Sequence, residues 1–137
     1  MIAPDRRLRL LVVEDHQANV DLLLAILNRC DDQALRQAHV SVAATLREAR
    51  ALASTTAHDV VILDMRLPDG NGLDLIPQLR QVATGRPRVL AVSAHAMEPD
   101  RSAAMQAGCA EFLGKPYLPS ELVAALQRVL VMDGQAG

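Results

Sequence analysis

Five side chains of this 137-residue sequence could together hold a divalent cation and a phosphoryl group, provided that the fold brings them close. They are three carboxylates, a hydroxyl and an ammonium, from Glu14, Asp15, Asp64, Ser93 and Lys115. Neighbouring carboxylates raise one another's pKa, and Mg²⁺, which prefers oxygen ligands, relieves that repulsion. Asp64 could act as the nucleophile, since carboxylates form aspartyl-phosphate intermediates. The hydroxyl and the ammonium could bind phosphoryl oxygens, which suits phosphoryl transfer.

Each of the five residues ends or follows a short apolar run that is typical of a strand covered on both faces. Glu14 and Asp15 follow the first run, Asp64 ends the third, Ser93 ends the fourth, and Lys115 follows the fifth. The five runs cover residues 8–13 (LRLLVV), 40–43 (VSVA), 60–64 (VVILD), 89–93 (VLAVS) and 110–114 (AEFLG).

Helical spacing of apolar residues separates these strands. Thr45 and Glu48 form a capping-box pattern at the start of the second helix. Pro77 is tolerable in the third helix only within its first turn, where backbone N–H groups have no partners in any case. Pro99 can begin the fourth helix and Gly108 can end it. The apolar positions are Val20, Leu23, Leu24 and Leu27 in the first helix, Leu73, Ile76, Leu79 and Val82 in the third, and Leu122, Val123, Leu126, Val129 and Leu130 in the last.

This alternation predicts an α/β fold, a doubly wound parallel sheet with right-handed crossovers and helices on both faces. In such sheets the ligand site lies beyond the carboxyl ends of the strands. All five chemical side chains stand at those ends, so we expect them to meet on one rim.

Composition argues against several other classes of protein. The net charge of −2 gives no broad basic field for nucleic acid, and Phe112 and Tyr117 are too few aromatics for base stacking. Residues Arg6, Arg7 and Arg9 are expected to be a solvated lead-in to the first strand. No signal peptide and no apolar run of membrane-spanning length is found, so a cytoplasmic setting without direct membrane contact is the expectation. The two cysteines, Cys30 and Cys109, form no CxxC pair and indicate neither a zinc site nor a disulfide framework.

Four motifs in this order resemble the receiver domains of two-component response regulators, which have the flavodoxin-like fold. They are VVED at the first strand, LDMRLPDGNG at the third, VSAH at the fourth and AGCAEFLGKPY around the fifth. The resemblance covers about residues 7–131 and implies a single receiver domain over residues 1–137. It also implies a five-stranded sheet of order 2-1-3-4-5.

The resemblance implies a role for each residue of the site. Asp64 would be the phosphoacceptor, assisted by Lys115 and by Ser93, the switch hydroxyl. Mg²⁺ would be bound by Asp15 directly, by Glu14 more indirectly through water, and by Asp64 together with the backbone carbonyl of Arg66. His16, beside the acidic pair, is not expected to be a ligand because Mg²⁺ prefers oxygen.

Further positions match the family's pattern. Phe112 would be the switch aromatic that turns inward when the Ser93 hydroxyl moves. Arg66 and His95 occupy the variable positions that tune hydrolysis of the acyl phosphate. The Lys115–Pro116 peptide bond is expected to be cis and to aim the lysine at the site.

The function implied is a switch that accepts a phosphoryl group from the phosphohistidine of a histidine kinase or a histidine phosphotransfer protein. It would catalyse its own phosphorylation and dephosphorylation, which leaves its status as an enzyme open. Phosphorylation would shift two pre-existing states and change the surface of the fourth helix, fifth strand and fifth helix, about residues 99–130. That surface could form a homodimer or bind an output partner. We expect no output segment within these residues, which could be a stand-alone receiver or part of a hybrid histidine kinase.

Three alternatives use the same fold or chemistry. A receiver-like protein-binding module that works without phosphorylation would not need all five residues. A flavin-binding protein would need a phosphate-binding loop after the first strand, where EDHQAN is acidic. A phosphatase with an aspartate nucleophile would need a second aspartate where this sequence has Met65 and Arg66.

Overall fold

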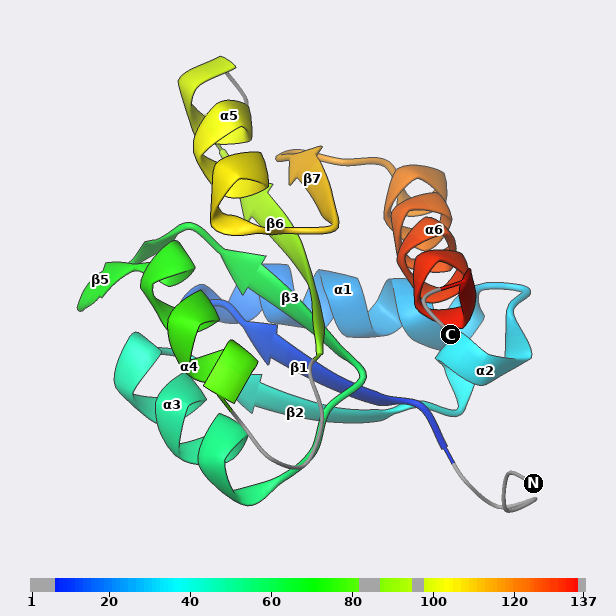
Figure 1. Cartoon of the computed structure of the whole chain (residues 1–137). Coiled ribbons are helices and arrows are strands. Elements are labelled where there is room, and N and C mark those ends of the chain that lie inside the picture. Colours follow the sequence, from blue (N-terminus) through cyan, green and yellow to red (C-terminus); the bar gives the residue numbers. More distant parts are fainter. Residues whose placement is uncertain (1–6, 82–86, 95–97, 136–137) are drawn as a thin grey trace.

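A parallel five-stranded sheet forms the centre of the protein (Figure 1). The computed structural model describes residues 7–81, 87–94 and 98–135. The strands are β1 (Arg9–Val13), β2 (His39–Ala43), β3 (Val60–Asp64), β6 (Arg88–Ser93) and β7 (Glu111–Gly114). Their order across the sheet, β2-β1-β3-β6-β7, confirms the predicted order of five parallel strands.

The register of the strands brings their carboxyl ends level. Val13 pairs with both Ala43 and Leu63, and Asp64 pairs with Val92. At the next interface Ser93 pairs with Gly114. Residues that end or directly follow these strands therefore lie along one edge of the sheet, as the sequence predicted.

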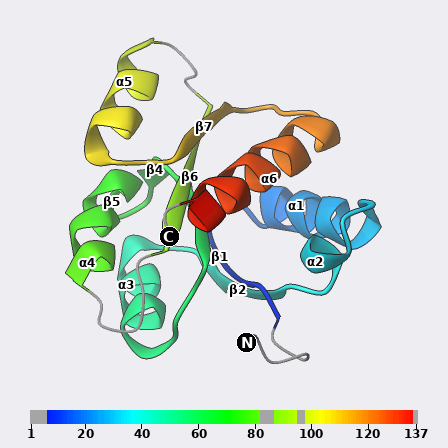
Figure 2. The ribbon, with the colours of Figure 1, turned by 45° about the vertical axis from the view of Figure 1, so that its right-hand side comes forward.

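Helices cover both faces of the sheet (Figure 2). One face carries α1 (Gln17–Arg29), α2 (Gln33–Arg36) and α6 (Pro119–Gln135), and the other carries α3 (Leu46–Thr55), the 3₁₀ turn η1 (Gly72–Leu75), α4 (Ile76–Gln81) and α5 (Glu98–Ala107). Leu10 and Val12 belong to the core on the first face, whereas Leu11 and Val13 belong to the core on the second. Successive strand residues point to opposite faces, so burial of both faces accounts for the continuous apolar runs.

Several elements differ from the sequence-based expectation. The helix α2 and a two-stranded antiparallel ribbon, β4 (Arg66–Leu67) with β5 (Gly70–Asn71), were not predicted. The third helix is split into η1 and α4, with Pro77 in the first turn of α4 as its missing N–H requires. Val82, expected in that helix, lies outside the described residues. The last helix extends to Gln135, beyond its last predicted apolar position.

Side-chain caps mark the start of α3, and a glycine marks the end of α5. The hydroxyl of Thr45 accepts a hydrogen bond from Glu48 N at 3.0 Å, which confirms the predicted cap of α3. Asp69, distant in sequence, accepts from Leu46 N and Arg47 N at the same helix end. Gly108 follows α5 with a φ of +101°, a conformation that glycine adopts without a steric penalty.

Among the described residues, no helix combines the length and apolar character needed to cross a membrane.

Candidate functional site

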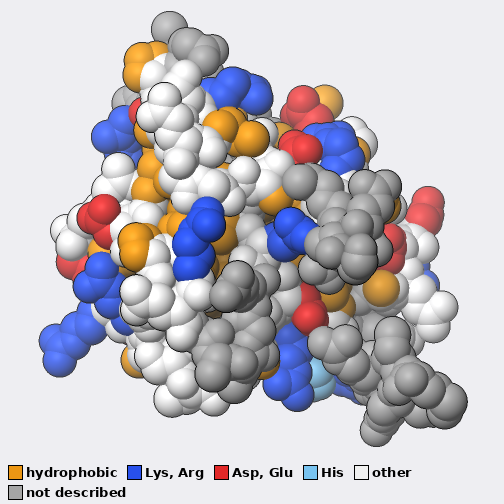
Figure 3. Space-filling model, viewed as in Figure 1, with side chains coloured by type: hydrophobic (Ala, Val, Ile, Leu, Met, Phe, Trp, Pro, Cys, Tyr) orange, Lys and Arg blue, Asp and Glu red, His pale blue; other side chains and the backbone are white. Residues whose placement is uncertain are grey.

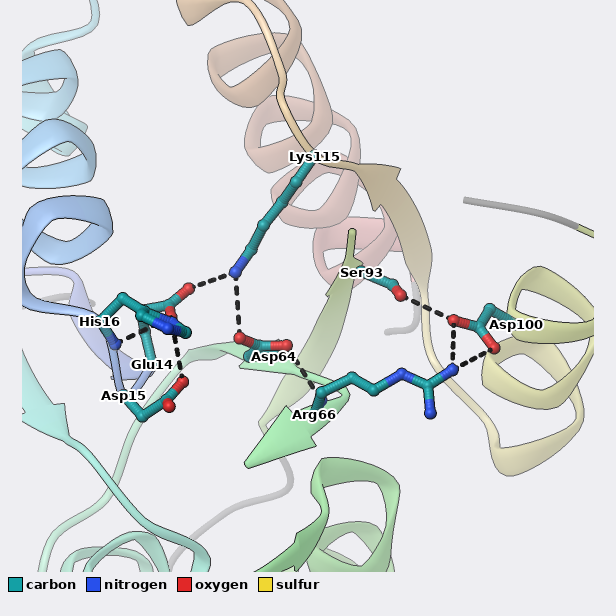
Figure 4. Close-up of polar contacts among 8 residues, drawn as sticks. All are labelled: Glu14, Asp15, His16, Asp64, Arg66, Ser93, Asp100 and Lys115. Atoms are coloured by element: carbon teal, nitrogen blue, oxygen red, sulfur yellow. Dashed lines mark hydrogen bonds and ion pairs between the residues drawn. The ribbon is translucent and has the colours of Figure 1, made fainter. Parts of the chain in front are cut away.

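The five predicted site side chains lie together at the carboxyl edge of the sheet (Figure 4). They come from four different strands or the residues just after them: Glu14 and Asp15 after β1, Asp64 on β3, Ser93 on β6 and Lys115 after β7. Their convergence follows from parallel strands held in level register.

The Lys115 ammonium joins two of the carboxylates. Its Nζ lies 2.5 Å from Glu14 Oε1 and 3.0 Å from Asp64 Oδ2. The side chains of Glu14 and Asp64 are 8% and 6% exposed, and that of Lys115 is 17% exposed. Buried charges are stable only when they are paired, so the lysine makes it possible for both carboxylates to be charged at this edge.

Burial and ion pairing shift the pKa values of these groups in different directions. Burial alone would raise the pKa of Glu14, but hydrogen bonds from Lys115 and from the His16 backbone outweigh it and hold that pKa below its ordinary value. For Asp64, burial dominates over the hydrogen bonds from Arg66 N and Lys115, so its pKa is raised. Burial would lower the pKa of Lys115, yet its two carboxylate partners raise it. The charged forms of Glu14 and Lys115 are therefore stabilised, whereas burial disfavours the charged form of Asp64.

The acidic pair after β1 provides oxygen atoms that suit a cation. Asp15 Oδ1 is buried and accepts no hydrogen bond, although His16 Nδ1 lies 3.2 Å away. Glu14, Asp15 and His16 form a group of potential ligands whose atoms lie within 4.8 Å of one another. His16 precedes α1 and its side chain is 71% exposed. A buried carboxylate oxygen without a donor is a fitting ligand for Mg²⁺, so the residues present fit that ion.

The backbone around Asp64 is closely packed. Arg66 N donates to Asp64 Oδ1 at 2.9 Å, and Gly72 N donates to Met65 O at 2.9 Å. The second bond brings the end of the β4–β5 ribbon back against β3. The orientation of the Asp64 carboxylate is consequently determined by main-chain atoms as well as by Lys115.

The contacts that Asp100, on α5, makes with the site were not predicted from the sequence. The Ser93 hydroxyl donates to Asp100 Oδ2 at 2.7 Å, and Arg66 Nη2 lies 3.3 Å from each oxygen of that carboxylate. Ser93 thus points toward α5 in this structure (Figure 4). No signal in the sequence relates Asp100 to the site, because an acidic residue in the first turn of a helix already favours the helix dipole.

The remaining predictions for the site concern Phe112, the Lys115–Pro116 peptide bond and His95. Phe112 is already buried, 5% exposed, and the Arg101 guanidinium lies 5.0 Å from the centre of its ring. Its inward turn on activation stays a prediction. The Lys115–Pro116 peptide bond is cis, as the resemblance implied. His95, the second tuning position, lies outside the described residues.

Fold and site together define a receiver domain of two-component signalling. The family model of the response regulator receiver domain matches residues 10–127, and the chain belongs to this family.

Two relatives and one solved structure illustrate the similarity. The chain is 38% identical over 120 residues to the KDP operon transcriptional regulatory protein KdpE of Escherichia coli, covering 88% of this chain and 50% of KdpE. It is 32% identical over 120 residues to an uncharacterized 14.6 kDa protein in the sodA1 3′ region of Leptolyngbya boryana, covering 87% of each. It therefore spans half the length of one relative and most of the other.

The solved structure is the receiver domain of the sensor histidine kinase PA1611 of Pseudomonas aeruginosa. It superimposes with a TM-score of 0.75 at 29% identity, covering 90% of this chain and 97% of that one. In that structure a magnesium ion is coordinated in the active site cleft. A receiver domain of this similarity therefore binds Mg²⁺.

Proposed function

We propose that this protein is a phosphorylation-dependent switch that accepts a phosphoryl group on Asp64 from the phosphohistidine of a histidine kinase or a histidine phosphotransfer protein. One observation carries the proposal. Asp64 is a buried carboxylate at the rim of the sheet, held by Lys115 and flanked by the acidic pair Glu14 and Asp15. A receiver-like fold without this chemistry would have no need to hold three carboxylates and an ammonium in one place.

In the transfer one bond to phosphorus forms, one breaks, and the total charge is unchanged. A carboxylate oxygen of Asp64 attacks the phosphorus of the phosphohistidine, and the phosphorus–nitrogen bond breaks. The electron pair of that bond remains on the imidazole nitrogen, and an acyl phosphate forms on Asp64. Lys115, already within 3.0 Å of Asp64 Oδ2, pairs with a phosphoryl oxygen after a small movement of its long side chain.

Asp15, Glu14, Asp64 and the backbone carbonyl of Arg66 would hold Mg²⁺ beside the phosphoryl group. When bound, the ion supplies positive charge that neutralises the phosphoryl oxygens in the transition state. The buried Asp15 Oδ1, which accepts no hydrogen bond, supports a direct contact from Asp15. Glu14, engaged by Lys115 and by His16 N, is better suited to a contact through water.

The surface of α5, β7 and α6, about residues 99–130, would carry the signal to a second copy or to an output partner. Apolar and basic side chains lie side by side over α5 (Figure 3). Arg101 covers Phe112, and Arg128 pairs with Glu111 at 3.1 Å and 3.2 Å. A change at Ser93 reaches this surface through Asp100, which belongs to α5.

Intact-protein mass spectrometry tests the acceptor. The protein is incubated with acetyl phosphate and Mg²⁺, alongside Asp64→Asn and the control Asp74→Asn, which removes an exposed carboxylate on η1. We expect a gain of one phosphoryl group in the parent and the control, and none in Asp64→Asn or with a chelator. Incubation with a phosphorylated histidine phosphotransfer protein then tests the donor class, and sedimentation with beryllofluoride tests dimer formation.

The main competing function is a protein-binding module that works without phosphorylation. A parent protein that gains no phosphoryl group and shows no beryllofluoride binding would favour this module. Gain of a phosphoryl group by Asp64→Asn would instead place the acceptor elsewhere.

A further inference from the structure

Asp100 joins two side chains that flank the phosphoacceptor. Ser93 ends β6, Arg66 lies two residues after Asp64, and both reach the same carboxylate on the third residue of α5. The side chain of Asp100 is 15% exposed and Ser93 is fully buried, whereas the side chain of Arg66 is 59% exposed. Figure 4 shows the three side chains meeting at the start of the helix.

We propose that Asp100 is a positioning residue that holds the Ser93 hydroxyl and the Arg66 guanidinium toward α5 in the unphosphorylated protein, and that the phosphoryl group competes with Asp100 for them. This inference rests on the proposed phosphorylation of Asp64. It adds an acceptor to the switch that neither the five side chains of the site nor the family resemblance provides.

The competition at Ser93 follows from the chemistry of a hydroxyl. A serine hydroxyl has one proton to donate, and an ionised carboxylate can only accept. At 2.7 Å, the bond from Ser93 Oγ to Asp100 Oδ2 has the short length of a charge-assisted hydrogen bond. Ser93 is fully buried, so its proton must be given to a nearby acceptor. Donation to a phosphoryl oxygen therefore requires the bond to Asp100 to break.

Arg66 contributes through its position more than through the strength of its ion pair. The side chain of Arg66 is 59% exposed. Because solvent screens such an exposed ion pair, the pair contributes little to the free energy of folding. The backbone N–H of Arg66, however, donates to Asp64 Oδ1 at 2.9 Å. The residue is thus bound to Asp64 through its main chain and to α5 through its side chain. A phosphoryl group on Asp64 would lie beside a guanidinium that Asp100 now attracts.

The loss of both partners would leave a partly buried carboxylate in the first turn of α5 without these two donors. A carboxylate that lacks hydrogen-bond donors is unfavourable, so the start of α5 would shift toward a conformation in which Asp100 regains donors or water. Phosphorylation of Asp64 would in this way change the surface of α5. The phosphorylated state is correspondingly less favourable for as long as Asp100 retains its two donors. Removal of Asp100 should therefore favour the phosphorylated state.

Binding of beryllofluoride, a phosphoryl analogue, tests this directly. The affinity is measured by NMR titration of the backbone amides at a fixed Mg²⁺ concentration for the parent, Asp100→Ala, Asp100→Asn and the control Asp74→Asn. Loss of one hydrogen bond to a charged group corresponds to a change of roughly tenfold or more. We expect Asp100→Ala to bind about tenfold more tightly, with the control unchanged. Asp100→Asn, which keeps an acceptor oxygen for Ser93 but loses the charge, should show a smaller gain and serves if the alanine variant does not fold.

The same comparison in a Ser93→Ala background separates positioning from a general effect on the helix. Without the hydroxyl, most of the gain from Asp100→Ala should vanish. An unchanged or lower affinity in Asp100→Ala, or a gain that persists fully without Ser93, would overturn the role of Asp100 while leaving phosphorylation of the parent intact. If the parent itself neither binds beryllofluoride nor gains a phosphoryl group, the proposed function fails and this inference fails with it.

Discussion

Gly72 lies directly against the backbone carbonyl of Asp64. A Cβ atom at position 72 would stand 2.0 Å from Asp64 O and 3.1 Å from a methyl carbon of Leu63. The absence of a side chain at Gly72 thus allows the β4–β5 ribbon to return close to Asp64. Since one contact is with backbone, a larger residue could be accommodated only by movement of the main chain at Asp64.

Gly72→Ala should therefore impair both stability and phosphoryl uptake. Overpacking of this kind typically costs about 1–3 kcal/mol in the free energy of unfolding. Urea unfolding and mass spectrometry after acetyl phosphate treatment measure the two effects. Gly70→Ala is the matched control, since Gly70 has a φ of +150° but its Cβ would meet only a Leu46 side chain at 3.4 Å. We expect that control to lose stability and keep its uptake; parental uptake by Gly72→Ala would contradict the argument.

Lys115→Met should destabilise the protein in the absence of divalent cations. The change leaves the carboxylates of Glu14 and Asp64 buried without the ammonium that they share. Because the site is partly open to solvent, we expect a loss of about 1–3 kcal/mol in the free energy of unfolding. Urea unfolding in a chelating buffer measures it. Adding Glu14→Gln to this variant should recover part of the loss, and a further loss in the double variant would refute the electrostatic explanation.

His58 should make stability depend on pH. Its side chain is buried, Nε2 has no hydrogen-bond partner, and burial together with the charge of Arg9 lowers its pKa from the ordinary 6.5, against the opposing effect of Asp59. The unfolded chain therefore binds a proton more readily than the folded one. Stability should fall as the pH decreases below about 6.5, until the pH reaches the lower pKa of the folded state.

Thermal unfolding between pH 5 and 8 tests this dependence, with His58→Gln beside the parent. The variant should lose part of the decline at low pH. His58 and the exposed His39 both line a small cavity of about 300 Å³. The variant His39→Gln therefore provides the control. An identical pH dependence in His58→Gln and the parent would show that His58 is not the group responsible.

Cys109 should resist thiol reagents in the folded protein. Burial raises the pKa of its thiol to about 11, although Arg80 acts in the opposite direction. At pH 8 only about 0.1% of such a thiol is thiolate, the reactive form. Cys30 is half-buried, so we expect one fast-labelling thiol in the native protein and two after unfolding. Labelling of Cys30→Ser at the parental rate would show that Cys109 is accessible.

The local pattern of the sequence was enough to predict the strands and the residues at their ends. Glu14, Asp15, Asp64 and Ser93 end or follow apolar runs, and parallel strands necessarily direct such ends to one edge. The Thr45 cap and the helix end at Gly108 were also predictable, because each depends on residues within a few positions. The resemblance to receiver domains added the order of the strands.

Contacts between residues distant in sequence were decided only by the tertiary structure. Asp69 accepts hydrogen bonds at the start of α3 from residues that are 22 and 23 positions away in the sequence. Asp100 on α5 contacts Ser93 on β6 and Arg66 on β4, so this contact joins three separate elements. The close approach of Gly72 to Asp64 likewise depends on how the β4–β5 ribbon folds back. The periodicity of apolar residues predicts which face of a helix or strand is buried, but it does not predict which side chains of two different elements come into contact. The chemical groups at the site were therefore readable from the sequence, whereas the interactions that hold and orient them required the packed fold.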